Sequence, residues 1–282
     1  MATTTPQALM RAKHSDEHQG GSSNMLVDIG HLKSDQESYI KLVVKPCLLQ
    51  LTLQAFHANM TPIGKMYGYG SQPQTKAILS VATLSNLEIE LLPFEYGVTN
   101  QSPEFTLKFP LARIPAFESL NGFKLTEGAT IARYVSSLVP DAGLLGCNAE
   151  ETALVDQWVH FAEFEIYMDA SMIYAGAGLK LLPGYNADRH KWHEERIVRS
   201  LRFLDNYLEK RPSGLLVNDN ITLADIFSAI ATERAGQTTC GTAEREQTYP
   251  HVFAHHAKVT SDERIKDVLG GPGFIEERLV YN

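Results

Sequence analysis

The chain has 282 residues, of which 44% are hydrophobic and 21% are charged. This length suits two globular domains, and the composition excludes collagen, coiled-coil and wholly disordered proteins. The 33 acidic residues outnumber the 25 Lys and Arg residues, giving a formal net charge of −8. Because an acidic chain repels phosphate backbones and no basic run is present, we expect no nucleic-acid partner.

Three cysteines, Cys47, Cys147 and Cys240, lie far apart along the chain. They form no CxxC pair, which excludes a disulfide scaffold and a cysteine-based zinc module and favours a reducing, cytoplasmic compartment. No run of about 18 apolar residues is present, so we expect no membrane contact through a spanning helix. The first residues also lack the apolar core of a secretory signal.

Residues 1–59 differ in composition from the rest of the chain. As far as Asn24 they are rich in Thr, Gln, His, Gly and Ser, a composition that buries too little apolar surface to offset ordering entropy. Residues 39–57 are more apolar, although Pro46 interrupts them. We expect a partly disordered extension with one apolar segment; a short strand and helix, or an amphipathic extension, are the alternatives. Met60 is a candidate alternative start.

Residues 60–141 alternate strand and helix signals. Pro73 suits a first helical turn, where its missing N–H would be unpaired, and Asn121-Gly122 is a strong hairpin turn. Because a βαβ unit prefers a right-handed parallel crossover, the pattern predicts a mixed four-stranded sheet with helices. The expected strands are 65–69, 87–91, 116–118 and 123–125, and the expected helices begin at Pro73 and after Thr126.

Residues 148–282 are helical in pattern almost throughout. Thr222, with Asp225 three residues later, is a variant of the capping box and predicts the start of a helix. Pro212 marks the end of the helix before it. The other predicted helices cover 150–175, 189–210, 250–259 and 262–269.

Several short motifs are shared with a known protein family. They are Asn100 to Phe105, Lys108 to Pro110, Arg113 to Glu118, Gln157 to Val159 with Phe161-Ala162, Ile221 to Asp225, and Tyr249-Pro250. Over residues 63–270 the chain resembles the glutathione S-transferases, above all the transferase-like domain of elongation factor 1 gamma, and also fungal members that serve biosynthetic pathways. The resemblance implies an α/β plus all-α fold, with a thioredoxin-like domain over 60–141 and an all-helical domain over 148–282.

The resemblance also implies a glutathione site. Ile114-Pro115 matches the cis-proline turn whose preceding backbone pairs with the cysteinyl backbone of glutathione, and X–Pro bonds lose most of their trans preference. Glu127 and Gly128 open a helix whose N-terminal N–H groups and dipole suit the γ-glutamyl carboxylate, while Glu127 meets the ammonium group. Members usually carry Ser or Thr in place of Gly128, so one hydroxyl donor is missing.

Three further polar residues would face the glycyl end of glutathione. A planar guanidinium such as that of Arg113 suits a carboxylate. Each of these residues also has a simpler explanation. Pro115 would be an ordinary trans-proline, Glu127 would be a favourable acid in the first turn of a helix, and the other three would lie in a solvated polar loop. The implied glutathione-binding residues are Arg113, Ile114, Pro115, Glu127, Gly128, Asn100 and Gln101.

The catalytic position follows the first strand. Family members use Tyr, Ser or Cys there to hydrogen-bond the glutathione sulfur and lower its thiol pKa, because the thiolate is the nucleophile. The candidate catalytic residues here are Ser71, Gln72 and Tyr69, with Gln72 at the usual serine position and Ser71 beside it. Ser71 would equally suit a helix N-cap.

A second substrate would lie between the two domains, against the long first helix of the helical domain. Met and aromatic side chains make an adaptable apolar cavity, and the candidates are Phe164, Tyr167, Met168 and Met172. Core or dimer-interface roles are the alternative for these residues. The histidines of the helical domain have no carboxylate at motif spacing, so we expect them on the surface and expect no metal requirement.

These features favour a glutathione-dependent transferase or trans/cis isomerase that acts on an apolar conjugated electrophile, with glutathione as co-substrate or cofactor. The resemblance implies a homodimer and suggests fungal secondary-metabolite biosynthesis. The alternative is a non-catalytic interaction module like that of elongation factor 1 gamma. The chain ends at Asn282, and we expect it to lack that factor's further C-terminal domain, which argues against a translation role.

Overall fold

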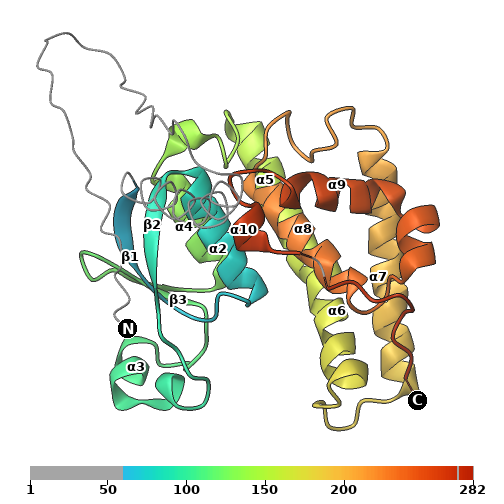
Figure 1. Cartoon of the computed structure of the whole chain (residues 1–282), viewed down its shortest axis with the longest axis horizontal. Coiled ribbons are helices and arrows are strands. Elements are labelled where there is room, and N and C mark those ends of the chain that lie inside the picture. Colours follow the sequence, from blue (N-terminus) through green and yellow to red (C-terminus); the bar gives the residue numbers. More distant parts are fainter. Residues whose placement is uncertain (1–59, 272, 282) are drawn as a thin grey trace, which may run out of the picture. The chain divides into compact units, whose positions relative to one another are not determined.

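The computed structural model describes residues 60–271 and 273–281, and Figure 1 shows their arrangement. The sheet and the helices belong to one compact unit, Ala55–Asn282. The prediction of a partly disordered extension over 1–59 lies outside the described residues. Within the described part of the chain, no helix is long and apolar enough to cross a membrane.

Four strands form a mixed sheet in the order β2-β1-β3-β4. β1 pairs with β2 in parallel, and β3 runs antiparallel to both β1 and β4. This confirms the predicted βαβ unit followed by a hairpin, whose turn places Gly122 at φ +84°. The strands are β1 (Thr61–Tyr67), β2 (Leu87–Leu92), β3 (Ala116–Ser119) and β4 (Lys124–Thr126).

The two faces of the sheet bury different clusters because successive strand residues point to opposite sides. Met66 and Phe117 belong to the main core, which continues into the helical part of the chain. Their neighbours Tyr67 and Ala116 belong to a second, smaller cluster with Phe105. Both faces of this sheet are therefore covered.

The helices α2 (Pro73–Leu84) and α4 (Gly128–Ser137) contact each other and contribute to the main core, and Pro73 occupies the first turn of α2 as predicted. The second cluster is covered by α3 (Pro103–Lys108), a short helix that the sequence patterns did not reveal. Ser102 caps it by accepting a hydrogen bond from the Phe105 N–H at 3.2 Å.

A long helical run follows, close to the predicted 150–175. It consists of α5 (Ala149–Phe161), the π-helical segment η3 (Ala162–Tyr167), α6 (Met168–Ile173) and a second π-helical segment η4 (Tyr174–Gly178). π-helical turns inside helices occur frequently at functional sites. The helices that follow this run are α7 (Ala187–Leu208), α8 (Leu223–Gly236), η5 (Glu244–Thr248), α9 (Pro250–Thr260) and α10 (Lys266–Leu269). Two short 3-10 helices, η1 (Thr99–Gln101) and η2 (Pro140–Ala142), lie earlier in the chain.

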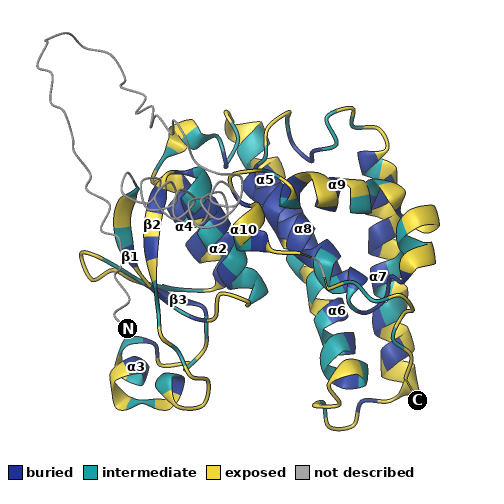
Figure 2. Ribbon diagram, viewed as in Figure 1, coloured by how far each residue is buried: buried dark blue, intermediate teal, exposed yellow. Residues whose placement is uncertain are grey.

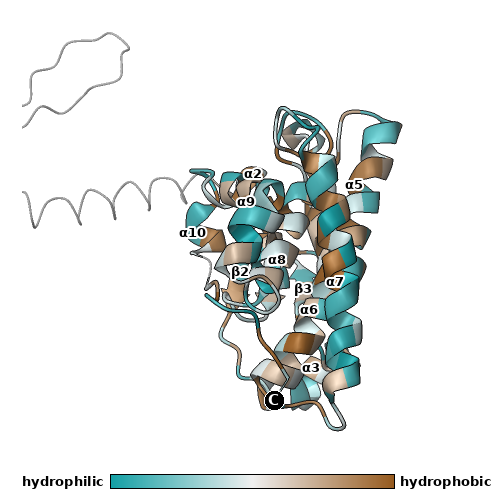
Figure 3. Cartoon of the chain, turned by 90° about the vertical axis from the view of Figure 1, so that its right-hand side faces the viewer, coloured by the Kyte–Doolittle hydropathy of each residue, from teal (hydrophilic) through white to brown (hydrophobic). Residues whose placement is uncertain are grey.

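The helix α8 is buried along most of its length, whereas α7 keeps a hydrophilic side (Figures 2 and 3). The predicted capping box at the start of α8 is confirmed. Asp225 accepts hydrogen bonds from the Thr222 N–H at 2.8 Å and the Thr222 hydroxyl at 2.7 Å. Hydrogen bonds from Thr222 to Asp225 in the first turn thereby stabilise the N-terminus of α8.

The prediction of surface histidines is wrong for four side chains, which the fold buries. His193 pairs with Asp169 at 2.8 Å, and His255 pairs with Asp225 at 3.0 Å. Burial lowers the pKa of the neighbouring His256 to about 4, with a further contribution from His255. Long-range packing brings His193 and His255 beside buried carboxylates, which explains why these two side chains are inside. The buried histidines are His190, His193, His255 and His256.

Polar contacts join the thioredoxin-like part to the helical part, among them the pair of Arg133 on α4 with Asp156 on α5 at 2.8 Å. Lys76 on α2 donates to the Leu269 carbonyl at 2.6 Å and pairs with Glu233 of α8 at 3.8 Å. Burial raises the pKa of Glu233, opposed by Lys76 and Arg234. The start of α2 is thus placed against the last turns of α8.

Candidate functional site

The segment before β3 is held by the start of α2. The Ile114–Pro115 peptide bond is cis, as the resemblance implied. Gln72 donates from Nε2 to the Ile114 carbonyl at 3.1 Å, and its Oε1 accepts from the Thr75 hydroxyl at 3.1 Å. A carbonyl oxygen has a second lone pair, so the Ile114 carbonyl can still accept from a ligand.

Asn100 organises the loop that precedes this segment. It is 1% exposed, accepts from the Gly97 N–H at 2.6 Å and donates to the Ala112 carbonyl at 2.9 Å. This leaves Asn100 without surface for direct contact with a ligand, so it can only position its neighbours. Gln101 and Arg113 are exposed, and Arg113 follows the residue that Asn100 holds.

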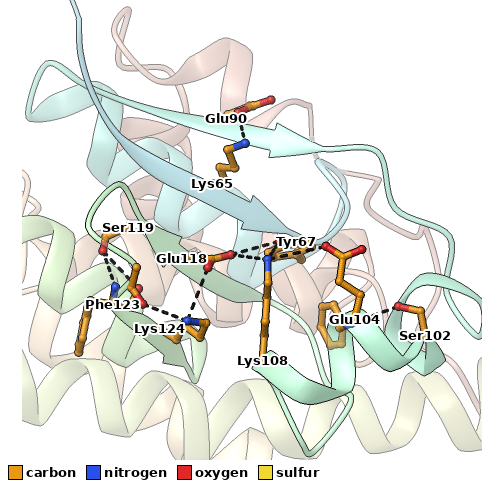
Figure 4. Close-up of polar contacts among 12 residues, drawn as sticks. Lys65, Tyr67, Glu90, Ser102, Glu104, Lys108, Glu118, Ser119, Phe123 and Lys124 are labelled. Carbon is orange, nitrogen blue, oxygen red and sulfur yellow. Dashed lines mark hydrogen bonds and ion pairs between the residues drawn. The ribbon is translucent and has the colours of Figure 1, made fainter.

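A polar cluster fixes α3 to the sheet (Figure 4). Lys108 donates to Glu118 at 2.9 Å and to the Tyr67 hydroxyl at 3.3 Å. The hydrogen bond with Glu118, followed by that with Tyr67, raises the pKa of Lys108, while the same contact lowers the pKa of Glu118. Lys124 pairs with the other oxygen of Glu118 at 3.6 Å. The cluster holds the loop that carries Arg113 and was missed by the sequence motifs.

Glu127 adopts a backbone conformation that L-residues rarely use. Its φ is +69°, directly before the first residue of α4, and its side chain is exposed. Such outliers cluster at ligand-binding sites, where the surrounding structure holds them. The carboxylate forms no hydrogen bond within α4 or elsewhere in residues 60–271, so it is available to a cation.

Gly128 allows a close approach between α4 and α2. A Cβ at this position would lie 2.7 Å from Cβ and 2.8 Å from Cγ of Gln74. The hydroxyl donor that family members usually carry at this position therefore has no room here. The backbone N–H of Gly128 remains as the donor at the helix N-terminus.

Glu163 on η3 is a candidate site residue that the sequence analysis missed. Burial raises its pKa most strongly; His160 opposes the shift and the negative charge of Glu127 adds to it. The two carboxylates therefore lie close enough to repel each other, although they are far apart in sequence. A cation held between them would relieve this repulsion.

We expect the Glu163→Gln variant to unfold at a higher temperature than the wild type at neutral pH. A raised native pKa means that the native state binds the proton more tightly, so wild-type stability falls as the pH rises above 4.5, the ordinary value. Below that pH the difference in unfolding temperature between the variant and the wild type should disappear. Thermal unfolding at neutral pH and below pH 4.5 tests this, with the exposed Glu150→Gln as control. An equal gain in unfolding temperature at both pH values would contradict the prediction.

The three candidate catalytic residues have different surroundings. Gln72, not Ser71, is the N-cap residue of α2, and its amide is engaged by Ile114. Ser71 is exposed. The Tyr69 hydroxyl accepts from the Tyr96 N–H at 2.6 Å, and its ring packs edge-on against Phe94. The hydroxyl groups of Tyr69 and Ser71 can therefore both still donate a hydrogen bond.

The residues predicted to line a second-substrate cavity divide between different surroundings. Phe164 and Met168 are exposed, and Phe164 stacks on His160 with ring centroids 6.1 Å apart. Tyr167 lies instead near the Arg234 guanidinium, 5.9 Å from its ring centroid. Met172 is half-buried.

No group of three or more His, Cys, Asp or Glu side chains able to hold a metal occurs among the described residues. A pocket of about 400 Å³ lies around Tyr185, Lys180 and Tyr281 and contains none of the predicted site residues.

Comparisons with known proteins identify the family of both domains. The family profile described as "Glutathione S-transferase, N-terminal domain" matches residues 62–137, and "Glutathione S-transferase, C-terminal domain" matches 183–270. The glutathione S-transferase-like protein FUS3 of Gibberella moniliformis is 36% identical over 78% of this chain and 99% of its own length. Human elongation factor 1-gamma is 35% identical over 58% of this chain and 36% of its own length.

Solved structures share the fold. The GST-like domain of elongation factor 1-gamma from Saccharomyces cerevisiae has a TM-score of 0.67 at 22% identity, covering 78% of this chain and 99% of that domain. The glutathione transferase URE2P6 from Phanerochaete chrysosporium, in complex with oxidized glutathione, has a TM-score of 0.65 at 20% identity, covering 73% of this chain and 94% of its own. With its thioredoxin-like domain followed by a helical domain, the chain belongs to the glutathione S-transferase family.

Proposed function

We propose that this chain is a glutathione-dependent transferase or trans/cis isomerase that acts on an apolar conjugated electrophile. The observation that carries the proposal is Glu127, an exposed carboxylate at φ +69° beside the free N-terminal N–H groups of α4. This pairing of an anion with backbone donors fits an amino-acid head group, whose ammonium and carboxylate lie side by side. Relatives from Gibberella and Fusarium support a role in fungal secondary metabolism.

Each part of glutathione would meet a different element of the chain. Glu127, with Glu163 close to it, would hold the ammonium group, and the Gly128 N–H would donate to the γ-glutamyl carboxylate. The Ile114 backbone would pair with the cysteinyl backbone. Arg113 would reach the glycyl carboxylate, for which its planar guanidinium is suited.

Bound glutathione would supply a thiolate nucleophile. The residues of this chain would keep the thiol deprotonated by donating hydrogen bonds to it, which lowers a thiol pKa. Ser71 and Tyr69 are suited to this because both hydroxyls can donate, whereas the amide of Gln72 already donates to Ile114.

Titration of the purified chain with reduced glutathione in a calorimeter tests the proposal. We expect saturable binding in the micromolar to low millimolar range. Binding would then justify assays of conjugated enones and polyenes for conjugation or for trans/cis exchange. No heat of binding at several millimolar would refute the enzyme and favour the alternative below.

The alternative is a non-catalytic interaction module of the elongation factor 1 gamma type. The crowding of Gly128 by Gln74 favours it, because the hydroxyl donor usual at this position is excluded. We further propose a cytoplasmic homodimer, as is usual for family members. Light scattering of the purified chain distinguishes a dimer from a monomer.

A further inference from the structure

Arg234, on the last turn of α8, is a half-buried cation whose guanidinium forms no ion pair and no hydrogen bond in residues 60–271 and 273–281. Its Nε atom is buried and donates no hydrogen bond. Its neighbour Glu233 is instead paired with Lys76 at 3.8 Å. Burying a charged donor without a partner is costly. The unused donors of Arg234 therefore indicate a group that this part of the chain does not itself supply.

Other arginines of the same part of the chain do not share this situation. Several are satisfied by carboxylates or carbonyls, as Arg196 is by Asp169 at 2.8 Å. Those without such partners, Arg113, Arg189 and Arg202, are exposed, so solvent can satisfy their donors. Arg234 combines partial burial with missing partners.

Two tyrosines hold the Arg234 guanidinium in place. Its central carbon lies 4.2 Å from the ring centroid of Tyr174 and 5.9 Å from that of Tyr167. A ring face attracts the charge, but it leaves the N–H groups in the guanidinium plane without acceptors. The tyrosines orient the cation and leave its donor edge free.

A further donor lies on the same side of the long helical run. Ser171 stands four residues after Tyr167 and three before Tyr174, spacing that places all three on one helical face. Its hydroxyl oxygen is buried and has no hydrogen-bond partner. Tyr167 and Tyr174, which the Arg234 guanidinium contacts, thus share a helical face with this unpaired hydroxyl.

We propose that Arg234, Tyr167 and Tyr174 bind the carboxylate of an acidic second substrate, so that the conjugated electrophile is a carboxylic acid. The planar fork of a guanidinium matches a carboxylate with two parallel hydrogen bonds. The tyrosine rings suit the apolar, conjugated body attached to it. This inference rests on the proposed function in taking the acid to be the partner of glutathione.

The position of the cluster fits a second substrate. Tyr167 follows Glu163 by four residues, about one turn within the π-helical segment η3. On the other side, Lys76 pairs with the residue before Arg234 and stands on α2, which begins just after Ser71. The proposed carboxylate site therefore lies beside the residues assigned to glutathione. Because glutathione itself has a glycyl carboxylate, that group is the other ligand which Arg234 could bind.

Calorimetry with benzoylpropionic acid and its methyl ester tests the inference, because both lack the reactive alkene and the ester replaces the negative charge by one methyl group. In the presence of glutathione, the wild-type chain is expected to bind the acid about 10–100-fold more tightly than the ester, the usual strength of a hydrogen-bonded ion pair. The Arg234→Met variant should lose this preference and keep its affinity for glutathione. The exposed Arg189→Met is the matched control and should keep both.

Three results would overturn the inference: equal binding of acid and ester by the wild type, an unchanged preference in Arg234→Met, or a loss of glutathione affinity in that variant alone. The last would assign the carboxylate to glutathione. An Arg234-dependent preference for the acid without any glutathione binding would refute the proposed function and support the acid site. If Arg234→Met does not fold, as judged by circular dichroism, the acid-over-ester preference is measured in Arg234→Lys instead. The comparison of acid and ester in the wild type then still supports or overturns the inference.

Discussion

The Asp225→Ala variant is expected to lose roughly 3–5 kcal/mol of stability, the usual cost of removing one partner of a buried charged pair. Asp225 is fully buried and accepts four hydrogen bonds. The donors are the Leu216 N–H, the N–H and hydroxyl of Thr222, and Nε2 of His255. Without the carboxylate, all four donors would be buried and unpaired. Chemical denaturation followed by circular dichroism measures the loss.

The pH dependence of Asp225 follows from its lowered pKa. Burial alone would raise it, but the hydrogen bond and charge of His255, with the N–H groups of Thr222 and Leu216, together lower the pKa below 3.8. A lowered native pKa contributes stability above pH 3.8 that is lost as the pH falls through the native value. The exposed Asp219→Asn is the control. A loss of stability as small as in that variant would contradict the assigned role.

The Glu127→Ala variant is expected to bind glutathione roughly 10–100-fold more weakly, because a hydrogen bond to a charged group contributes about 1.5–3 kcal/mol. Calorimetric titration with reduced glutathione measures the change. Glu127→Gln keeps an acceptor but removes the charge, so its affinity should lie between those of the wild type and Glu127→Ala.

The exposed Glu88→Gln on β2 serves as the control for charge alone and should bind glutathione as the wild type does. The unfolding temperature of both Glu127 variants should remain close to that of the wild type because the side chain is exposed. Full binding by Glu127→Ala would refute the site assignment even if the wild type binds glutathione.

The candidate site was only partly predictable from its residues. Short motifs placed Pro115, Glu127 and Gly128 at their elements because a turn and a helix start are local features. The motifs could not show that Gln72 donates to Ile114, 42 residues away, or that Asn100 is buried. Those outcomes depend on how a loop closes over the sheet, which no local pattern encodes.

The sequence by itself determined the order and type of most elements. Alternating apolar residues at 87–91, Pro73 in a first turn, the Asn121-Gly122 hairpin and the capping box at Thr222 act within a few residues, so short-range sterics and hydrogen bonding are sufficient.

The tertiary structure alone decided which polar groups meet. It brings His193 to Asp169 across 24 residues, His255 to Asp225 across 30, and Arg234 between the rings of Tyr167 and Tyr174. A local pattern specifies which face of an element is apolar, but not which distant face it packs against. The pairing of buried charges depends on that packing, because each must find its partner on another element once water is excluded.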